Sequence, residues 1–366
     1  MEKKDPRENE IRRMLSGRHV FVTGADGFIG SHLLDKLVEY EAKVHAFIRV
    51  KSVIGIRNIA HLKDKITTHY GNLVDKHSVD IAIGKFKEEA ETSDKKPIIF
   101  HLAAQAHVGE SWLWPYETLM SNVIGTFNLL QSVVDSGMDI FKFDTAGTSE
   151  EYGNVKEDVK HHYDFDEHGC VIQHERTPIN PKSIYATSKV AADFLTMNYH
   201  DGYGLPTVVT RMFNNYGPRQ NPRYITGTII TQALSRDEIL LGNLEPKRDF
   251  CYVGDGVRGH IYIALFGRPG DMYCYGYGKN ISMKDWADLI LKIGKELGYW
   301  EKRKVRSVKE RFRPGESDVY ELKVGYEKLH KETGWKPLVD WNEGIRRTIE
   351  WYANNRDKWA GLVDWK

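Results

Sequence analysis

The stretch RHVFVTGADGFIG, residues 18–30, decides the fold class. Its first half is an apolar run of strand length, and Gly24, Gly27 and Gly30 follow at the spacing GxxGxxG. Residues 28–37 then carry apolar side chains at helical spacing. A strand, a glycine-rich turn and a helix in this order predict the first βα unit of a nucleotide-binding sheet.

Each glycine has its own task in such a unit. Gly24 permits the tight turn, Gly27 lets the backbone approach a pyrophosphate, and Gly30 lets the helix and the strand pack closely. The amide groups at the helix N-terminus then face the negative charge. The alternative is a glycine-rich turn that holds no ligand.

Strands and helices alternate through the first 210 residues. Strands are expected at 18–23, 43–48, 97–102, 141–145 and 206–210, and helices at 28–37 and 122–134. This alternation predicts an α/β fold with a Rossmann-type, doubly wound parallel sheet.

The C-terminal part differs in composition. Seven of the nine tryptophans lie between Trp286 and Trp365, where they are expected to anchor the core of a smaller lobe. The expected division is a charged N-terminal tail (1–16), a nucleotide-binding domain (17–212, with a returning segment at about 248–268) and the lobe (213–247 and 269–366). Residues 156–175, rich in His, Asp and Glu, are expected to form a solvated loop.

Bulk composition excludes several classes of protein. The 52 basic and 51 acidic residues give a net charge of +1, which provides no field for a nucleic acid or an anionic membrane. Three distant cysteines and the lack of CxxC or HExxH motifs predict neither a disulfide framework nor a metal site. No secretory signal and no apolar run of about 18–20 residues is present, so a cytoplasmic, soluble protein is expected.

The end of the second strand bears on the choice of cofactor. An acidic residue there binds the ribose 2′-hydroxyl of NAD, whereas a basic residue accommodates the 2′-phosphate of NADP. The sequence IRVKS, residues 48–52, offers Arg49 and Lys51 and no carboxylate. It therefore favours NADP over NAD, with a basic exposed loop as the alternative.

Tyr185 and Lys189 stand four residues apart in SIYATSK. On a helix this spacing places both on one face. A nearby ammonium and a nicotinamide cation both favour a phenolate, so a lowered pKa would make Tyr185 a base toward a substrate hydroxyl. Lys189 could also bind the cofactor ribose. A surface pair on a helix is the alternative.

Six motifs together resemble a known family. They are TGADGFIG (23–30), HLAAQAHV (101–108), GTSEEYG (147–153), SIYATSK (183–189), FNNYGPRQNP (213–222) and KRDFCYV (247–253). They are similar to the extended short-chain dehydrogenase/reductase family that acts on nucleotide sugars, and the similarity extends over nearly the whole chain from Arg18 onward. The resemblance implies a Rossmann domain with a C-terminal substrate lobe and a triad of Thr148, Tyr185 and Lys189.

The same resemblance implies further contacts. Beside the glycines, Arg49, Tyr185 and Lys189, the cofactor-binding residues are expected to be Phe28, Ile29, Asn72, Leu73, Leu102, Ala103 and Ala104. Those near the substrate diphosphate are expected to be Asn215, Arg223, Arg248 and Arg313. His101 and His107 are expected in the core or behind the site. The family implies a homodimer packed through the helix that bears Tyr185.

The motif GTSEEYG distinguishes reactions within the family. Epimerase members need only the hydroxyl and the Tyr–Lys pair, whereas 4,6-dehydratases also need a base for C5, and Glu150 stands in that place. Ser149 departs from the aspartic acid of dTDP-glucose 4,6-dehydratases and resembles the GDP-mannose type, which favours a GDP-hexose. Glu150 would then serve as both base and acid, or it is a loop carboxylate; Glu151 is expected to be structural or solvated.

Other interpretations of the function stay open. SSEEYG in GDP-6-deoxy-4-ketohexose reductases resembles the same motif, so a 4-ketoreductase that consumes NADPH is one alternative. A 4-epimerase is another, and a non-catalytic NADP-binding sensor or scaffold is a third. The favoured interpretation is a nucleotide-sugar 4,6-dehydratase with a tightly held NAD(P).

Overall fold

A seven-stranded parallel sheet is the centre of the computed structural model, which describes residues 5–50, 52, 56–315 and 317–363. Its strand order is β12-β8-β5-β4-β1-β2-β3. The strands are β1 (His19–Thr23), β2 (Lys43–Arg49), β3 (Ile66–Gly71), β4 (Ile98–His101), β5 (Lys142–Thr148), β8 (Thr207–Met212) and β12 (Asp271–Tyr275). The chain order reverses between β1 and β4, which confirms the predicted doubly wound sheet.

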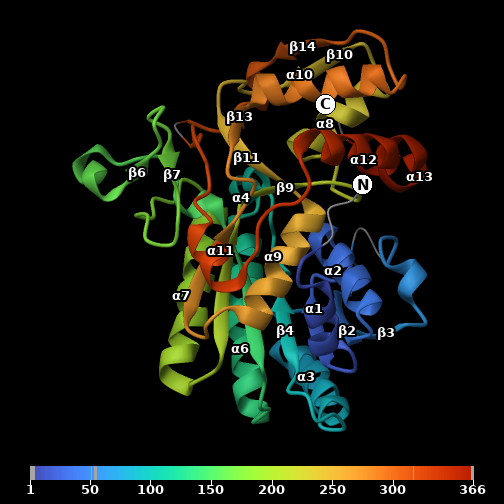
Figure 1. The fold of residues 1–366 in the computed structure, drawn as a ribbon, viewed down its shortest axis with the longest axis vertical. Coiled ribbons are helices and arrows are strands. Elements are labelled where there is room, and N and C mark those ends of the chain that lie inside the picture. The colour runs from blue at the N-terminus through green and yellow to red at the C-terminus, as the bar shows by residue number, and fades with distance from the viewer. Residues whose placement is uncertain (1–4, 51, 53–55, 316, 364–366) are drawn as a thin grey trace.

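Helices cover both faces of this sheet (Figure 1). One face carries α3 (Lys76–Ala90), α6 (Gly125–Ser136) and α7 (Ile184–Tyr203), and the other carries α2 (Phe28–Glu39), α9 (Val253–Phe266) and α11 (Glu327–Thr333). Shorter pieces are α4 (Val108–Leu113), α5 (Pro115–Leu119), a π-helical turn (Met120–Ile124) and 3₁₀ turns at Ala60–Leu62, Ser149–Glu151, Glu157–His162, Lys309–Arg311 and Ala360–Leu362.

Alternate side chains of β1 pack into two separate hydrophobic clusters, one on each face of the sheet. Val20 and Val22 pack in the cluster that includes Leu33 of α2, whereas Phe21 packs in the cluster that includes Phe86 of α3. This is the period of two that a strand imposes. Burial on both faces explains why the strand is apolar throughout.

Residues 5–16 form an ordered part of the domain, which corrects the prediction of a charged tail for the described part of that segment. Helix α1 (Glu8–Leu15) buries Ile11 and Leu15. The carboxylate of Asp5 accepts hydrogen bonds from Arg258 and Tyr262 of α9. The apolar side chains four residues apart share one face of the helix, and this face packs into the core.

The smaller lobe lies at the top of Figure 1 and carries the tryptophans. It comprises β9 (Asn214–Tyr216), β10 (Glu238–Leu241), β11 (Lys247–Tyr252), β13 (Asn280–Ser282), β14 (Lys304–Ser307), α8 (Ile225–Ala233), α10 (Met283–Glu296), α12 (Trp341–Asn354) and α13 (Arg356–Trp359). Trp286 stacks on Phe250 at 4.1 Å, and Trp300, Trp335 and Trp359 are also buried, as expected of core anchors. Trp365 lies outside the described residues.

The boundary expected at residue 268 is displaced. Strand β12 (Asp271–Tyr275) pairs in parallel with β8 and completes the main sheet, and α11 packs against α9 and β12. The returning segment 248–268 is split, since its first residues form β11 in the lobe while α9 covers the sheet. Strand pairing between distant segments is not visible in local sequence periodicity, which explains the difference.

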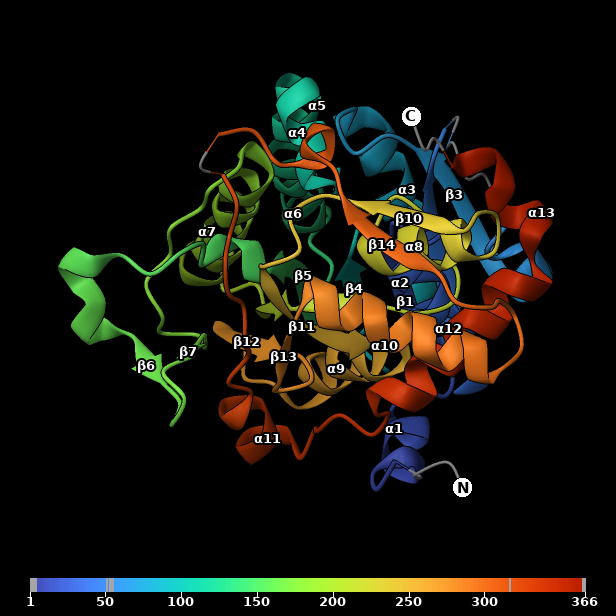
Figure 2. The same ribbon diagram turned by 90° about the horizontal axis from the view of Figure 1, so that it is seen from above.

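Residues 156–175 are more structured than a solvated loop. A short hairpin of β6 (Asp164–Phe165) and β7 (Val171–Ile172) stands away from the body in both views (Figure 2). The backbone N–H of Gln173, just after β7, donates to Lys323 O at 2.8 Å, and Lys323 forms an ion pair with Asp166 in the turn between the two strands. The segment is therefore tied to the C-terminal part of the chain.

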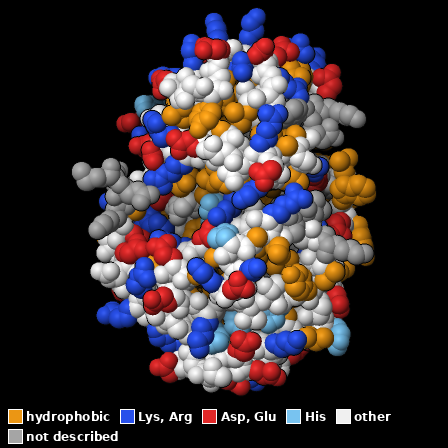
Figure 3. Space-filling model, turned by 90° about the vertical axis from the view of Figure 1, so that its right-hand side faces the viewer, with side chains coloured by type: hydrophobic (Ala, Val, Ile, Leu, Met, Phe, Trp, Pro, Cys, Tyr) orange, Lys and Arg blue, Asp and Glu red, His pale blue; other side chains and the backbone are white. Residues whose placement is uncertain are grey.

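Charges of both signs are interspersed over the face shown in Figure 3, as the net charge of +1 leads one to expect. Within the part of the chain that the structure describes, no helix combines the length and apolar character needed to cross a membrane.

Three histidines form a buried row beneath α3. His45 is hydrogen-bonded to His19 at 3.0 Å and to His69 at 3.1 Å across neighbouring strands. Burial lowers the pKa of all three side chains, and it lowers that of His45 to about 3. The folded protein therefore holds them neutral near pH 7.

Acidification below pH 6.5 should therefore destabilise the fold. An unfolded histidine has a pKa of about 6.5, so the unfolded chain binds more protons than the folded chain until the pH falls to the folded pKa. One histidine with the pKa of His45 then costs about 2 kcal/mol of unfolding free energy at pH 5. Urea unfolding at pH 7 and pH 5 measures this. Between pH 7 and pH 5, His45→Gln should lose less unfolding free energy than the unmodified protein, and exposed His168→Gln should lose as much as the unmodified protein. Equal losses in all three proteins would contradict the assigned role of the buried histidines.

Candidate functional site

The carboxyl ends of β1, β4 and β5 meet at one edge of the sheet, beside the glycine turn. Thr23 Oγ1, at the end of β1, accepts a hydrogen bond from Ala103 N at 3.2 Å and lies 2.8 Å from His101 Nδ1. This joins the turn at residues 24–27 to the loop after β4. His101 is buried, as expected of a residue behind the site.

The glycine turn has the geometry of a phosphate cradle. Gly24 has φ +67°, and a Cβ there would lie 2.8 Å from Ala103 N. A Cβ on Gly30 would lie 2.1 Å from Gly24 O, so only glycine fits where α2 crosses the turn. Helix α2 has no side-chain cap at Gly27, which leaves the amides of its first turn for a ligand.

Gly30→Ala is expected to disrupt this cradle. The added methyl group meets backbone, so the turn must move, at a cost of about 1–3 kcal/mol, and the affinity for a dinucleotide should fall. Gly84→Ala on α3 is the matched control, because a Cβ there meets nothing within 4 Å. Dinucleotide titration and urea unfolding of both variants measure the effects. Normal dinucleotide affinity in Gly30→Ala would contradict the assigned role of the turn.

The basic residues that favoured NADP stand at the end of β2 and just beyond it. Arg49 is exposed and lies 3.6 Å from Glu117 in an ion pair, and Lys51 lies outside the described residues. Ser52 donates a hydrogen bond to the carboxylate of Asp26, which is buried in the glycine turn. The segment therefore packs against the turn through Ser52.

The remaining predicted cofactor residues lie around the same edge. Phe28 and Ile29 open α2, while Leu102, Ala103 and Ala104 follow β4, all partly exposed. Asn72 follows β3, and its side-chain oxygen accepts a hydrogen bond from Val74 N at 3.2 Å. Leu73 is nearly buried and faces Gly125.

The motif GTSEEYG runs from the end of β5 into a 3₁₀ turn. Thr148 caps this turn, with its hydroxyl accepting from Glu150 N at 3.4 Å, while its own N–H donates to Glu151 Oε1 at 2.8 Å. Ser149, Glu150 and Glu151 are all buried. The capping box fixes the direction in which the three side chains leave the backbone.

Tyr185 and Lys189 lie on the first turns of α7, as predicted. Ser183 caps the helix, and its hydroxyl accepts from Ala186 N at 3.0 Å. Tyr185 and Lys189 are buried, and a hydrogen bond joins Tyr185 to Thr148. Two members of the predicted triad, Thr148 and Tyr185, thus meet, and Lys189 lies one turn further along the same helix.

The expected lowering of the Tyr185 pKa is not seen in the protein alone. Burial raises the pKa of this phenol, and Glu150 and Glu151 raise it further, whereas only the hydrogen bond with Thr148 lowers it among the main influences. Sequence spacing gave no measure of this burial, and the lowering expected with a nicotinamide cation beside the phenol stays a prediction. The protein's own groups therefore favour the neutral phenol.

A buried ionic cluster lies behind Lys189. Arg211 Nε on β8 is 2.8 Å from Glu151 Oε2 and 2.9 Å from Asp193 Oδ2. Burial lowers the pKa of Lys189, and Asp193 and Glu151 oppose that change. Burial and Asp193 raise the pKa of Glu151 well above its ordinary value. Glu151 is thus a structural residue that also faces Lys189.

Asn122 is a functional candidate that sequence reasoning missed. Its side-chain oxygen accepts from Gln105 N at 2.7 Å, and its Nδ2 donates to Gln105 O at 3.0 Å and to Ser188 Oγ at 2.8 Å. It therefore joins the loop after β4 to the helix that carries Tyr185. The only available signal was a buried polar residue within an apolar helical pattern.

The carboxylate of Glu150 is ion-paired with two arginines. Arg313 Nη1 is 3.1 Å from Glu150 Oε2 and Arg313 Nη2 is 3.3 Å from Oε1, while Arg248 Nη2 lies 3.9 Å from Oε1. Burial alone would raise the pKa of Glu150, but Arg313 and Arg248 outweigh it and hold the pKa below its ordinary value. The carboxyl group is therefore ionised near neutral pH.

The other predicted substrate residues are placed less favourably. Asn215 donates to Phe213 O and to Tyr275 OH, and it pairs with Cys251 across β9 and β11. Neighbours in register share a face and alternate along the strand, so Asn214, not Asn215, lies on the face of Arg248. Arg223 is exposed and ion-paired with Glu110.

Among the described residues, His19, His45 and Glu89 have ligand atoms close enough to share a metal ion. His19 opens β1, so this group lies at the opposite end of the strands from the glycine turn. His45 Nε2 already shares a hydrogen bond with His19. The group therefore has no contact with the site described above.

Comparison with known proteins agrees with this geometry. A family model described as GDP-mannose 4,6 dehydratase matches residues 21–348. The chain is 30% identical to the dTDP-D-glucose 4,6-dehydratase of Mus musculus, over 93% of this chain and 90% of that one.

Solved structures show the same fold. The dTDP-glucose 4,6-dehydratase of Streptomyces venezuelae, with NAD and TYD bound, superposes with a TM-score of 0.78 at 26% identity, over 94% of this chain and all of that one. The UDP-glucose 4-epimerase of Thermus thermophilus, in complex with NAD, gives a TM-score of 0.77 at 27% identity, over 92% and 99%.

Fold and site together define a Rossmann-type member of the extended short-chain dehydrogenases/reductases of the nucleotide-sugar type. Within this class, which the six motifs predicted, the chain belongs to the GDP-mannose 4,6 dehydratase family.

Proposed function

We propose that this protein is a nucleoside-diphosphate-sugar 4,6-dehydratase. Such an enzyme oxidises C4 of a hexose, removes the C5 proton, expels the C6 hydroxyl as water and returns a hydride to C6. The observation that carries the proposal is a buried, ionised carboxylate, Glu150, two residues after Thr148 and beside Tyr185. Removal of the C5 proton needs such a base in addition to the triad.

The glycine turn fits a dinucleotide, because α2 has no side-chain cap and Gly24 and Gly30 leave no room for a side chain. When bound, NAD(P) supplies the hydride acceptor for C4 and the hydride donor for C6. We favour NAD, since both solved enzymes described above hold NAD. The expectation of NADP rested on Arg49 and Lys51, and Arg49 is paired with Glu117.

Tyr185 accepts the proton of the C4 hydroxyl in this scheme. The hydrogen bond from Thr148 already favours the phenolate, and the positive charges of Lys189 and of an oxidised nicotinamide would add to it. Glu150 then removes the C5 proton and passes it to the C6 hydroxyl, which leaves as water. After the hydride has returned to C6, C5 takes up a proton again, which balances the proton that Tyr185 accepted from the C4 hydroxyl. Ser149 stands beside it without a carboxyl group, so Glu150 performs both transfers.

The nucleotide is best sought among dTDP- and GDP-hexoses. The expected preference for a GDP-hexose finds support in the description of the family model but not in the relatives, which are named for dTDP-glucose. We therefore place dTDP-glucose first. Arg248 and Arg313 are proposed to bind the diphosphate, with Asn214 on the same face as Arg248.

Mass spectrometry of the purified protein with dTDP-, GDP-, UDP- and CDP-hexoses tests the reaction. We expect a product lighter by one water, formed without net consumption of cofactor. An unchanged mass with a new sugar isomer would identify an epimerase, which the similarity to the UDP-glucose 4-epimerase makes the second candidate. Reaction only with a 4-keto sugar and NADPH together would identify a reductase.

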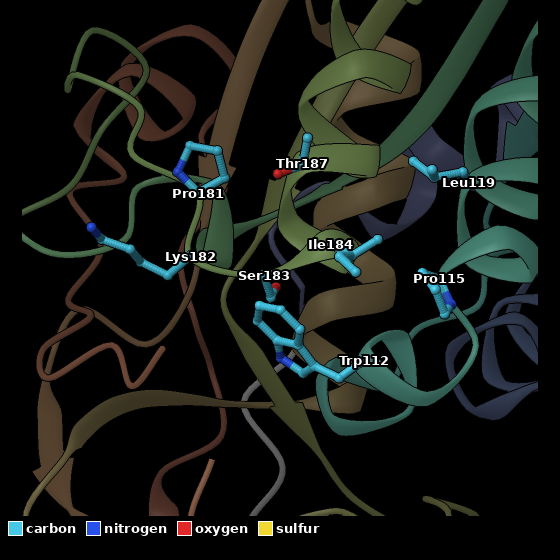
Figure 4. Close-up of a pocket in the computed structure, with 8 residues that line it drawn as sticks. All are labelled: Trp112, Pro115, Leu119, Pro181, Lys182, Ser183, Ile184 and Thr187. Carbon is cyan, nitrogen blue, oxygen red and sulfur yellow. The ribbon is translucent and has the colours of Figure 1, made fainter. Parts of the chain in front are cut away.

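A homodimer is also proposed, through the helices around α7. Exposed apolar side chains gather there, namely Trp112, Leu113, Trp114, Tyr116, Leu119, Phe127 and Phe194. A neighbouring depression has a volume of about 520 Å³. The residues that line it include Trp112 of α4, Leu119 of α5 and Ile184 of α7 (Figure 4). Exposed apolar side chains on neighbouring helices are typical of an interface, and a second copy suits it because the family resemblance implies packing through this helix.

Leu113→Glu should shift the protein from dimer to monomer. Leu113 is 71% exposed, so the monomer tolerates the charge while an apolar interface does not. Light scattering over a range of concentrations measures the mass. Tyr70→Glu, at an exposed position on β3, should leave the mass unchanged. A monomer in the unmodified protein at high concentration would contradict the proposal.

A further inference from the structure

Glu150 is ion-paired with the two arginines that are proposed to bind the diphosphate. The fork of Arg313 meets both carboxylate oxygens, at 3.1 and 3.3 Å, and Arg248 approaches one of them at 3.9 Å. Glu150 as a whole is only 7% exposed. A base at C5 must turn a carboxylate oxygen toward the substrate. Arginines that bind a diphosphate must turn their guanidinium groups away from Glu150. The three side chains therefore need another arrangement to perform the proposed roles.

The two arginines differ in how freely they can move. Arg248 is buried on β11, whereas the side chain of Arg313 is 27% exposed on the irregular segment after the 3₁₀ turn 309–311. Guanidinium groups pair with phosphate oxygens through the same planar fork that they use for carboxylates. The Glu150 carboxylate thus stands where an anionic oxygen pair of the diphosphate could be received.

We propose that the diphosphate of the substrate displaces Glu150 from Arg313 and Arg248, so that the base is released only when a nucleoside diphosphate is in place. This inference rests on the proposed function and adds a condition to it. Once separated from the arginines, the buried carboxylate keeps its desolvation and loses the partners that lower its pKa, so it becomes a stronger base. A hexose without the diphosphate leaves Glu150 paired.

The binding of product-like nucleotides tests the exchange. Glu150→Gln removes the competing charge, so we expect it to bind dTDP or GDP about 10-fold more tightly than the unmodified protein, while the affinity for the free nucleoside stays the same. Asp288→Asn is the control, because it removes one charge from an exposed pair with Lys284 on α10. Calorimetric titration of all three proteins provides the constants. A gain of affinity cannot arise from misfolding, and Glu150→Ala should show it as well.

The outcomes separate the inference from the proposed reaction. Unchanged or weaker affinity for the diphosphates in both Glu150 variants would overturn the exchange, even if the unmodified protein dehydrates a nucleotide sugar. Tighter binding in the variants, without dehydration by the unmodified protein, would uphold the exchange and overturn the reaction. If neither dTDP nor GDP binds any of the proteins, the exchange is overturned, and the reaction is judged separately by mass spectrometry with the four nucleotide sugars.

Discussion

Replacing Glu150 by glutamine is expected to stop the loss of water while oxidation at C4 continues. Glutamine keeps the shape of the side chain but cannot accept the C5 proton. Formation of the 4-keto-6-deoxy product should fall by about 10²–10⁴, whereas the bound cofactor should still be reduced when substrate is added. Single-turnover absorbance follows the cofactor, and mass spectrometry follows the product.

The exposed control Asp288→Asn should dehydrate its substrate at the rate of the unmodified protein. Product formation by Glu150→Gln within a few-fold of that rate would make Glu150 a structural carboxylate. The reaction would still be a dehydration, because the product shows it, and the base at C5 would have to be another residue.

Tyr185→Phe is expected to stop the reaction one step earlier. Without the phenol, no group takes the proton of the C4 hydroxyl, so both cofactor reduction and product formation should fall by about 10²–10⁴. The fold should tolerate the change, since the described contact that is lost is the hydrogen bond with Thr148. The same single-turnover assay distinguishes this variant from Glu150→Gln.

Tyr203→Phe makes the matched control, because it removes the same hydroxyl from the same helix at an exposed position. It should react like the unmodified protein. If Tyr185→Phe reduces the cofactor at a normal rate, the base at C4 has been assigned to the wrong residue.

Features that depend on local sequence could be predicted. The strand at 19–23, the glycine turn and helix α2 follow from periodicity and from backbone freedom over a few residues. The pair Tyr185 and Lys189 needed only a helical spacing of four. These predictions were correct because each rests on neighbours in the chain.

Features that depend on tertiary contacts could not be predicted from the sequence. Arg313 is 163 residues from Glu150 in sequence, and nothing local reveals that they pair. The facing of Asn214 and Asn215 depends on the register of β9 with β11. Burial decides the direction of the Tyr185 pKa, and it is a property of the folded chain. Ile11 and Leu15 did carry a readable signal, their helical spacing, which the surrounding charges obscured.

The packing of Gly153 has a consequence for how this architecture changes its chemistry. A Cβ there would lie 1.8 Å from Asn180 O, and Asn180 N donates to Glu151 O at 2.9 Å, so the turn carrying Glu150 is joined to the segment that leads into α7. The frame that holds the tyrosine therefore stays rigid whichever side chain occupies position 150. A substitution at position 150 can therefore change the catalytic side chain while the surrounding backbone stays the same. Dehydratases and epimerases can diverge from one scaffold by substitution at single positions.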